Sequence, residues 1–181
     1  MGKYSIKNCR SVVFDWDGTL HKTELIYINA FNEAYDFLVK EGYAEPKHFT
    51  DKEINSYLGM TAKAMWKVFM PQLPEEIKEH CSAMVGDYMI ENIYAGNARL
   101  YPGTEEMLDE LKSMGLKLYI LSNCQHSYLE AGARYFKLDR WFEKCYAAGD
   151  YGFKSKPEIL SEVIKSDGIE SEILMAGDRY S

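Results

Sequence analysis

Two carboxylates, Asp15 and Asp17, are the residues of this sequence best placed to do chemistry. They follow the apolar run 12–14 and precede Gly18 and Thr19, so they stand where a buried strand gives way to a glycine turn. Side chains two positions apart on an extended chain point to the same side, so both carboxylates can act on one substrate. One can attack a phosphorus atom and the other can handle the proton of the leaving group, which outlines a phosphoryl-transfer site.

Four apolar runs predict the strands that must position this pair. They are Ser11–Phe14, 116–121, 144–148 and Ile173–Ala176. Helical patterns lie between the later runs, over 104–114, 128–136 and 157–165, and Gly115 is expected to end the first of these helices. Strands that alternate with helices predict an α/β fold, with a Rossmann-like parallel sheet that carries helices on both faces.

Residues 21–98 break this alternation and predict helices only. One amphipathic stripe is expected from Leu25, Ile28, Phe31, Tyr35 and Leu38. Thr50 and Glu53 predict a capping box at the start of a second helix, and two more helices are expected over 61–69 and from Pro74 onward. We therefore expect an all-helical cap domain, 21–98, inserted into an α/β core domain made of 1–20 and 99–181. The alternative is that these helices simply pack on the sheet.

Polar side chains recur where the predicted strands end. Ser122 and Asn123 follow the second strand, Lys156 follows the third at a short distance, and Asp178 follows the fourth. Because ligands of open α/β sheets bind beyond the carboxyl ends of the strands, we expect these side chains to meet the two carboxylates at one edge. Each strand thus delivers a hydroxyl, an ammonium or a carboxylate group to the same place.

A dianionic phosphate bound at this edge needs its charge neutralised before a carboxylate can approach it. Mg²⁺ is suited to this, because it binds carboxylate, carbonyl and phosphate oxygens. Asp15 and Asp178 are the natural side-chain ligands, and the backbone carbonyl of Asp17 could add a third. Lys156 supplies a positive charge for the phosphate, and Ser122 supplies a hydroxyl donor.

These groups, taken in chain order, resemble the four motifs of the haloacid dehalogenase superfamily. The matching residues are Asp15-Trp16-Asp17-Gly18-Thr19, Ser122-Asn123, Lys156-Pro157 and Gly177-Asp178. The resemblance covers the whole chain, including the place of the helical cap, and is greatest to the phosphoglycolate phosphatase and β-phosphoglucomutase-like branch.

The resemblance implies a role for each matched residue. Asp15 would be the nucleophile that forms an aspartyl-phosphate, and Asp17 would protonate the leaving oxygen and then activate water. The phosphate would be held by Thr19, Ser122, Asn123 and Lys156, and Mg²⁺ by Asp15, Asp17 and Asp178. The implied activity is that of a Mg²⁺-dependent phosphatase acting on a small phosphorylated metabolite. The alternatives are a phosphomutase that passes the phosphoryl group to a sugar hydroxyl, and an impaired fragment that only binds phosphometabolites.

The sequence departs from the family pattern at two places. Lys22 stands where members commonly carry an acidic residue, so it belongs either to a solvated hinge or to an extra cation facing the substrate. The chain stops at Ser181, so we expect the family's last strand and helix to be missing and the run 173–176 to form a bare sheet edge. Lys154 is a rival to Lys156, which we prefer because Pro157 follows it.

Composition limits the partners. The net charge of −7 argues against a nucleic-acid-binding surface. The four cysteines are scattered, which favours free thiols in a reducing compartment over disulfides. Because no stretch has transmembrane length or the pattern of a signal peptide, we expect a cytoplasmic protein with no membrane partner, as a monomer or weak homodimer.

Overall fold

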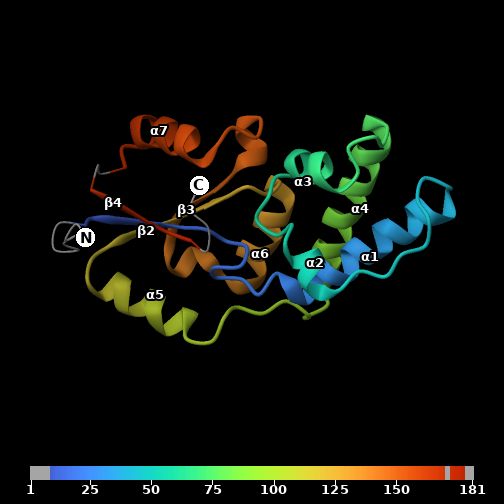
Figure 1. Ribbon diagram of the computed structural model, residues 1–181. Coiled ribbons are helices and arrows are strands. Elements are labelled where there is room, and N and C mark those ends of the chain that lie inside the picture. Colours follow the sequence, from blue (N-terminus) through green and yellow to red (C-terminus); the bar gives the residue numbers. More distant parts are fainter. Residues whose placement is uncertain (1–8, 170–171, 178–181) are drawn as a thin grey trace, which may run out of the picture.

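The computed structural model describes residues 9–169 and 172–177, and a four-stranded sheet lies at its centre (Figure 1). The strands are β1 (Ser11–Phe14), β2 (Lys117–Ser122), β3 (Phe142–Ala147) and β4 (Ile173–Ala176). Their order is β3-β2-β1-β4, and all pairs are parallel, with Val12 of β1 opposite Leu118 of β2 and Leu174 of β4. The predicted α/β fold with a parallel sheet is confirmed, and only β3 starts earlier than expected, by two residues.

Helices cover both faces of this sheet, as the alternation predicted. They are α5 (Thr104–Ser113), α6 (His126–Phe136) and α7 (Lys156–Ser166), with short 3-10 turns at Leu138–Arg140 and Ala148–Tyr151. Val12 and Phe14 point to the face where α5 and α6 pack, and Val13 points to the face where α7 packs. Figure 1 shows α7 above the sheet and α5 below it. Side chains therefore pack against β1 on both faces of the sheet, and this packing positions the end of β1 that leads into Asp15.

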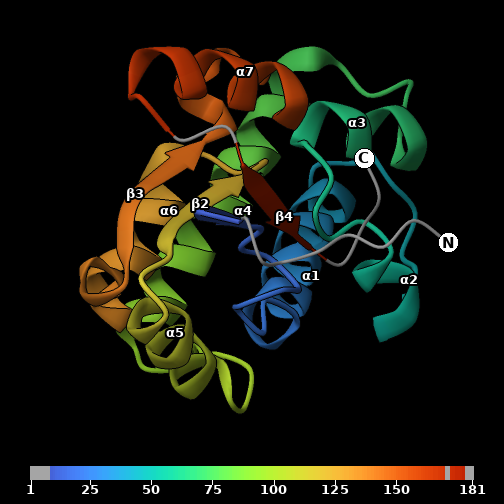
Figure 2. The same cartoon turned by 90° about the vertical axis from the view of Figure 1, so that its left-hand side faces the viewer.

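The remaining helices gather at one end of the molecule, beyond the sheet (Figures 1 and 2). They are α1 (Glu24–Lys40), α2 (Asp51–Asn55), α3 (Ala62–Phe69) and α4 (Glu75–Tyr94). They enclose an apolar cluster of their own, which includes Phe31, Leu38, Phe49, Ile54, Trp66 and Cys81. Ile26 and Ala30 of α1, with Met89 and Ile93 of α4, pack instead into the cluster under the sheet. The two long helices therefore attach the helical block to the α/β part.

Local sequence determines where these helices start. The predicted capping box is confirmed: the Glu53 N–H donates to Thr50 Oγ1 (3.3 Å), and the Thr50 N–H donates to Glu53 Oε2 (2.8 Å). The stripe predicted for α1 was partly wrong, because Leu25 is 45% exposed. The first turn of α1 meets the sheet cluster through Ile26 and Ala30, which rotates the buried face away from Leu25.

Three further expectations concern the surface and the thiols. The four cysteines are free, as predicted. β4 is an edge strand of the described sheet, and its Leu174 and Met175 are exposed. Within the ranges that the structure describes, none of the helices combines the length and apolar character needed to cross a bilayer.

Candidate active site

β1 and the turn after it hold the two predicted carboxylates. The Asp15 N–H donates to the Ala176 carbonyl of β4 (2.8 Å), which ties the end of β1 to its neighbour. Trp16 points into the core and is fully buried, and its ring stacks on His21 with centroids 5.0 Å apart. The Gly18 N–H donates to the His21 carbonyl (3.1 Å), and Gly18 has a φ of 73°, which glycine adopts without strain. Asp15 and Asp17 therefore flank the buried side chain of Trp16.

Asp15 is paired with Lys156. Lys156 Nζ lies 2.6 Å from Asp15 Oδ2, and the two side chains are only 9% and 10% exposed. Burial raises the pKa of Asp15, and the charge of Lys156 opposes that rise. Lys156 reaches this place because α7 begins there, with Ser155 and Glu158 forming a capping box.

The rival Lys154 lies elsewhere. It is exposed and pairs with Glu162, with the two charged atoms 2.5 Å apart. The geometry therefore selects Lys156 as the cation beside Asp15, as the sequence predicted.

Asp17 accepts hydrogen bonds from three hydroxyls. Thr23 Oγ1 and Tyr128 Oη donate to its Oδ1 at 2.8 Å and 2.9 Å, and Ser122 Oγ donates to its Oδ2 at 3.3 Å. Burial raises the pKa of Asp17, and these three hydrogen bonds oppose the rise. The sequence had singled out Ser122 but not Thr23 or Tyr128. The sequence signal that could have identified them is their position: Thr23 directly precedes α1, and Tyr128 lies in the first turn of α6.

His21 fixes two of these hydroxyls. Its Nδ1 lies 3.1 Å from Tyr128 Oη and 3.0 Å from Thr23 Oγ1. With the hydroxyl hydrogens of both residues on Asp17, the tautomer that carries its hydrogen on Nδ1 can donate to these oxygens. Burial lowers the pKa of His21 to about 4, so the ring is neutral at pH 7. The structure makes His21 a buried support for the hydrogen bonds of Asp17.

The other predicted residues lie around this centre. Asn123 Nδ2 donates to the Gly59 carbonyl (2.9 Å), in the turn between α2 and α3, which joins the end of β2 to the helical block. Thr19 is half-buried in the turn after Asp17, and its N–H donates to the Trp16 carbonyl at 3.3 Å. Lys22 lies over the ring of Tyr101, with Nζ 5.5 Å from the centroid.

Asp178, the third predicted metal ligand, lies outside the described residues. Gly177, directly before it, is described, and a Cβ there would lie 3.3 Å from Asp15 Cβ. The end of β4 therefore closely approaches the predicted nucleophile. Within the described ranges no group of three acidic, histidine or cysteine side chains stands close enough to hold a metal. The buried carboxylate of Asp15 and the backbone carbonyl of Asp17 are still oxygen donors of the kind that Mg²⁺ prefers.

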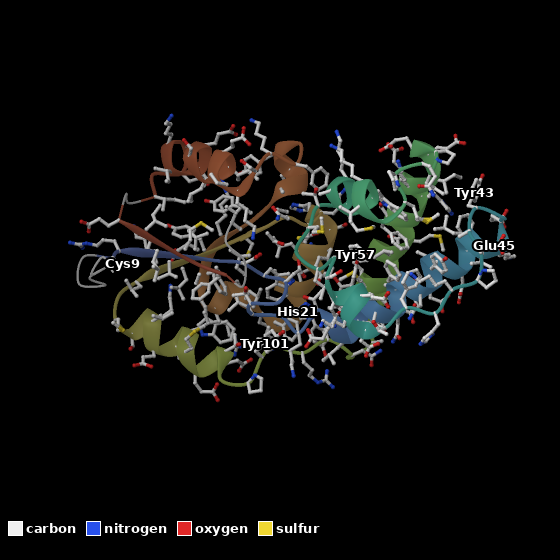
Figure 3. The ribbon with its side chains drawn as sticks, in the orientation of Figure 1. Cys9, His21, Tyr43, Glu45, Tyr57 and Tyr101 are labelled. Atoms are coloured by element: carbon white, nitrogen blue, oxygen red, sulfur yellow. The ribbon has the colours of Figure 1, made fainter. Side chains whose placement is uncertain are left out.

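A cavity of about 160 Å³ opens beside Asp17. Tyr128, Cys124 and Gln125 border it from the α/β side, and Thr23, the turn 57–60 and residues of α1, α3 and α4 close the rest. Figure 3 shows Tyr57, another lining residue, and His21 near the middle of the molecule, where the helical block meets the sheet.

A larger hollow of about 710 Å³ lies at the outer end of the helical block, beside Tyr43 and Glu45, which Figure 3 labels there. It touches none of the predicted site residues. The smaller cavity is therefore the candidate substrate site.

Comparison with known proteins relates this site to a family. A sequence model described as haloacid dehalogenase-like hydrolase matches residues 12–181. Pyrophosphatase PpaX of Halalkalibacterium halodurans is 27% identical over 173 residues, which cover 93% of this chain and 74% of the relative. Protein CbbY of Rhodobacter capsulatus is 27% identical over 152 residues, or 82% of this chain and 66% of the relative.

Solved structures share the fold. A predicted phosphatase from Clostridium acetobutylicum has a TM-score of 0.80 at 20% identity, over 94% of this chain and 76% of that one. A predicted phosphoglycolate phosphatase from Haemophilus somnus has a TM-score of 0.73 at 21% identity, over 94% of this chain and 77% of that one.

Proposed function

This chain belongs to the haloacid dehalogenase-like hydrolases, and we propose that it is a Mg²⁺-dependent phosphatase that works through an aspartyl-phosphate on Asp15. The family predicted from the four motifs is confirmed, and it makes the chain an enzyme. The observation that carries the proposal is the buried pair of Asp15 and Lys156, 2.6 Å apart. It sets a nucleophilic carboxylate beside a cation that can hold a phosphate oxygen, and the relative named pyrophosphatase supports phosphate chemistry.

In the first step, a carboxylate oxygen of Asp15 attacks the phosphorus of a small phosphate ester. The bond between phosphorus and the leaving oxygen breaks, and Asp17 gives its proton to that oxygen. A general acid must be protonated beforehand, and burial raises the pKa of Asp17 in that direction. The hydroxyls of Thr23 and Tyr128 keep the carboxyl group oriented toward the leaving oxygen.

In the second step, Asp17 takes a proton from water, and the water oxygen attacks the phosphorus of the aspartyl-phosphate. The bond from Asp15 to phosphorus breaks, inorganic phosphate leaves, and Asp15 and a protonated Asp17 are restored. Asp17 thus acts as an acid in the first step, in which it loses a proton, and as a base in the second step, in which it regains one.

The phosphate is held by Thr19, Ser122, Asn123 and Lys156 in this proposal. The Asn123 amide has two hydrogens, so it can keep its hydrogen bond to Gly59 while the other hydrogen meets a phosphate oxygen. Mg²⁺ bound by the carboxylates of Asp15 and Asp178 and by the backbone carbonyl of Asp17 would neutralise part of the phosphate charge.

Residues 21–98 act in this proposal as a cap over a core of 1–20 and 99–181. The separate apolar cluster of α1–α4 supports this division, as does the cavity where that block meets Asp17. A cap over the site would exclude water until the substrate is bound.

The test is phosphate release from phenyl phosphate, with Mg²⁺ or with a chelator. Asp15→Asn and Lys156→Met should abolish Mg²⁺-dependent release, and Lys154→Met, a matched control on an exposed lysine, should retain it. Release that survives in folded Asp15→Asn would contradict the proposal. A phosphoryl group recovered on a sugar hydroxyl would instead indicate a phosphomutase, and binding without turnover would indicate an impaired fragment.

A further inference from the structure

The cavity beside Asp17 is where the leaving group of a substrate would lie. Asp17 and two of its three hydroxyl donors, Thr23 and Tyr128, border it directly. An ester whose leaving oxygen receives a proton from Asp17 must therefore extend its organic part into this space. The lining of the cavity then selects the substrate.

That lining is aromatic and thioether-rich. It includes Tyr27, Phe31, Tyr57, Met60, Met65, Trp66 and Met89. Among the described residues that line it, Asp17 is the sole charged side chain, and no lysine, arginine or histidine is present. The Ser82 hydroxyl is already engaged, since it accepts from Trp66 Nε1 (2.8 Å) and donates to the Lys78 carbonyl (2.7 Å).

An anionic leaving group would find no cation among the described residues of this cavity. A second phosphate or a carboxylate placed there would lose its hydration without gaining a cation, and it would lie near Asp17. The lining therefore disfavours pyrophosphate and short phosphorylated acids, and it favours an uncharged apolar group.

The cavity has room for at least one ring. Its volume is about 160 Å³. An apolar protein cavity of about 150 Å³ takes up benzene, so a single aromatic or saturated ring fits here.

Gly86 gives independent support. It lies inside α4, where glycine costs roughly 1 kcal/mol relative to alanine. Its φ is not positive, and a Cβ there would meet nothing within 4 Å, so neither strain nor crowding requires glycine. It does line the cavity, so any side chain at this position would take space from a ligand. The glycine therefore keeps the cavity open at a cost to the helix.

We infer that the substrates of this enzyme are phosphate monoesters of an uncharged, ring-sized apolar alcohol or phenol. The inference rests on the proposed phosphatase function and adds the class of leaving group. Benzyl phosphate and phenyl phosphate represent the class, and phosphoglycolate, pyrophosphate and glucose 1-phosphate represent charged or polar alternatives.

The first experiment compares kcat/KM for these five compounds. The two ring esters should exceed each of the others by more than about tenfold, the discrimination that apolar burial supplies. Higher kcat/KM for pyrophosphate, phosphoglycolate or glucose 1-phosphate would overturn the inference and leave the phosphatase function standing. If none of the five is hydrolysed, the proposed function fails.

The second experiment fills the cavity. Gly86→Leu should lower the ratio of kcat/KM for benzyl phosphate to that for methyl phosphate by about tenfold. Asp87→Leu, at the exposed neighbouring position of α4, should leave the ratio unchanged. An unchanged ratio in a Gly86→Leu protein with native circular dichroism would overturn the inference.

Calorimetric titration gives a readout that needs no turnover. The parent chain should bind benzylphosphonate at least about tenfold more tightly than methylphosphonate, and Gly86→Leu should remove that preference. Equal affinities of the parent chain for the two phosphonates would overturn the assignment of the cavity, whether or not the enzyme hydrolyses esters.

Discussion

Gly132→Ala should destabilise the protein, although the same change at Gly86 should stabilise it. Both glycines lie inside helices, where alanine gains up to about 1 kcal/mol. A Cβ at Gly132, however, would lie 2.8 Å from Trp16 Cζ2, closer than any normal contact. The indole cannot move away easily, since it is fully buried and stacked on His21. Overpacking of this kind costs about 1–3 kcal/mol and so exceeds the helical gain.

Urea unfolding measures the outcome. The free energy of unfolding of Gly132→Ala should fall about 1–2 kcal/mol below that of the parent, and that of Gly86→Ala should rise by up to about 1 kcal/mol. The loss at Gly132 should vanish in a Trp16→Phe background, which lacks the clashing atom. Because Trp16 lies between Asp15 and Asp17, Gly132→Ala should also lower kcat. A Gly132→Ala protein at least as stable as the parent would refute this reasoning.

Three more predictions concern the buried histidine, the contact between the helical block and β2, and an ion pair far from the site. Burial lowers the pKa of His21 from 6.5 to about 4, so below pH 6.5 the unfolded chain binds the extra proton. The contribution of His21 to the free energy of unfolding should therefore fall by about 3 kcal/mol between pH 6.5 and 4, and the difference between urea titrations of the parent and of His21→Phe should show that slope. Asn123→Ala removes the 2.9 Å hydrogen bond to Gly59 and should raise KM for benzyl phosphate; steady-state kinetics with an unchanged KM would contradict this role. Tyr146 and Lys144 hold the pKa of Asp167 at about 2, so its stabilising effect is complete above pH 3.8 and lost as the pH falls through 2. Thermal unfolding of Asp167→Asn should lack that dependence between pH 4 and 2.

Much of the fold could be predicted from the sequence because the patterns that specify it are local. The run 11–14 has the apolar character of a strand buried on both faces, and the structure places β1 on those residues. Thr50 and Glu53 start α2 through bonds between neighbours, so the capping box also needs no tertiary information. Lys156 could be preferred over Lys154 because Lys156-Pro157 matches the third motif of the family, and α7 begins at Lys156.

The features that could not be predicted depend on contacts between segments that are distant in the sequence. Tyr128 donates to Asp17 across 111 positions of sequence, and no periodicity in α6 indicates that contact. His21 became a support for Asp17 because the turn after β1 folds it back under Trp16. The exposure of Leu25 followed from where α1 meets the sheet cluster. The apolar character of the cavity likewise required side chains from several helices to be brought together.

The most direct test of the account is to find the covalent intermediate. Acid-quenched enzyme taken during turnover of benzyl phosphate with Mg²⁺ can be digested and sequenced by mass spectrometry. The account predicts one added phosphoryl group on Asp15, absent in Asp15→Asn and in enzyme quenched without substrate. A phosphoryl group on Ser122, Thr19 or another residue, or none at all while turnover proceeds, would contradict it.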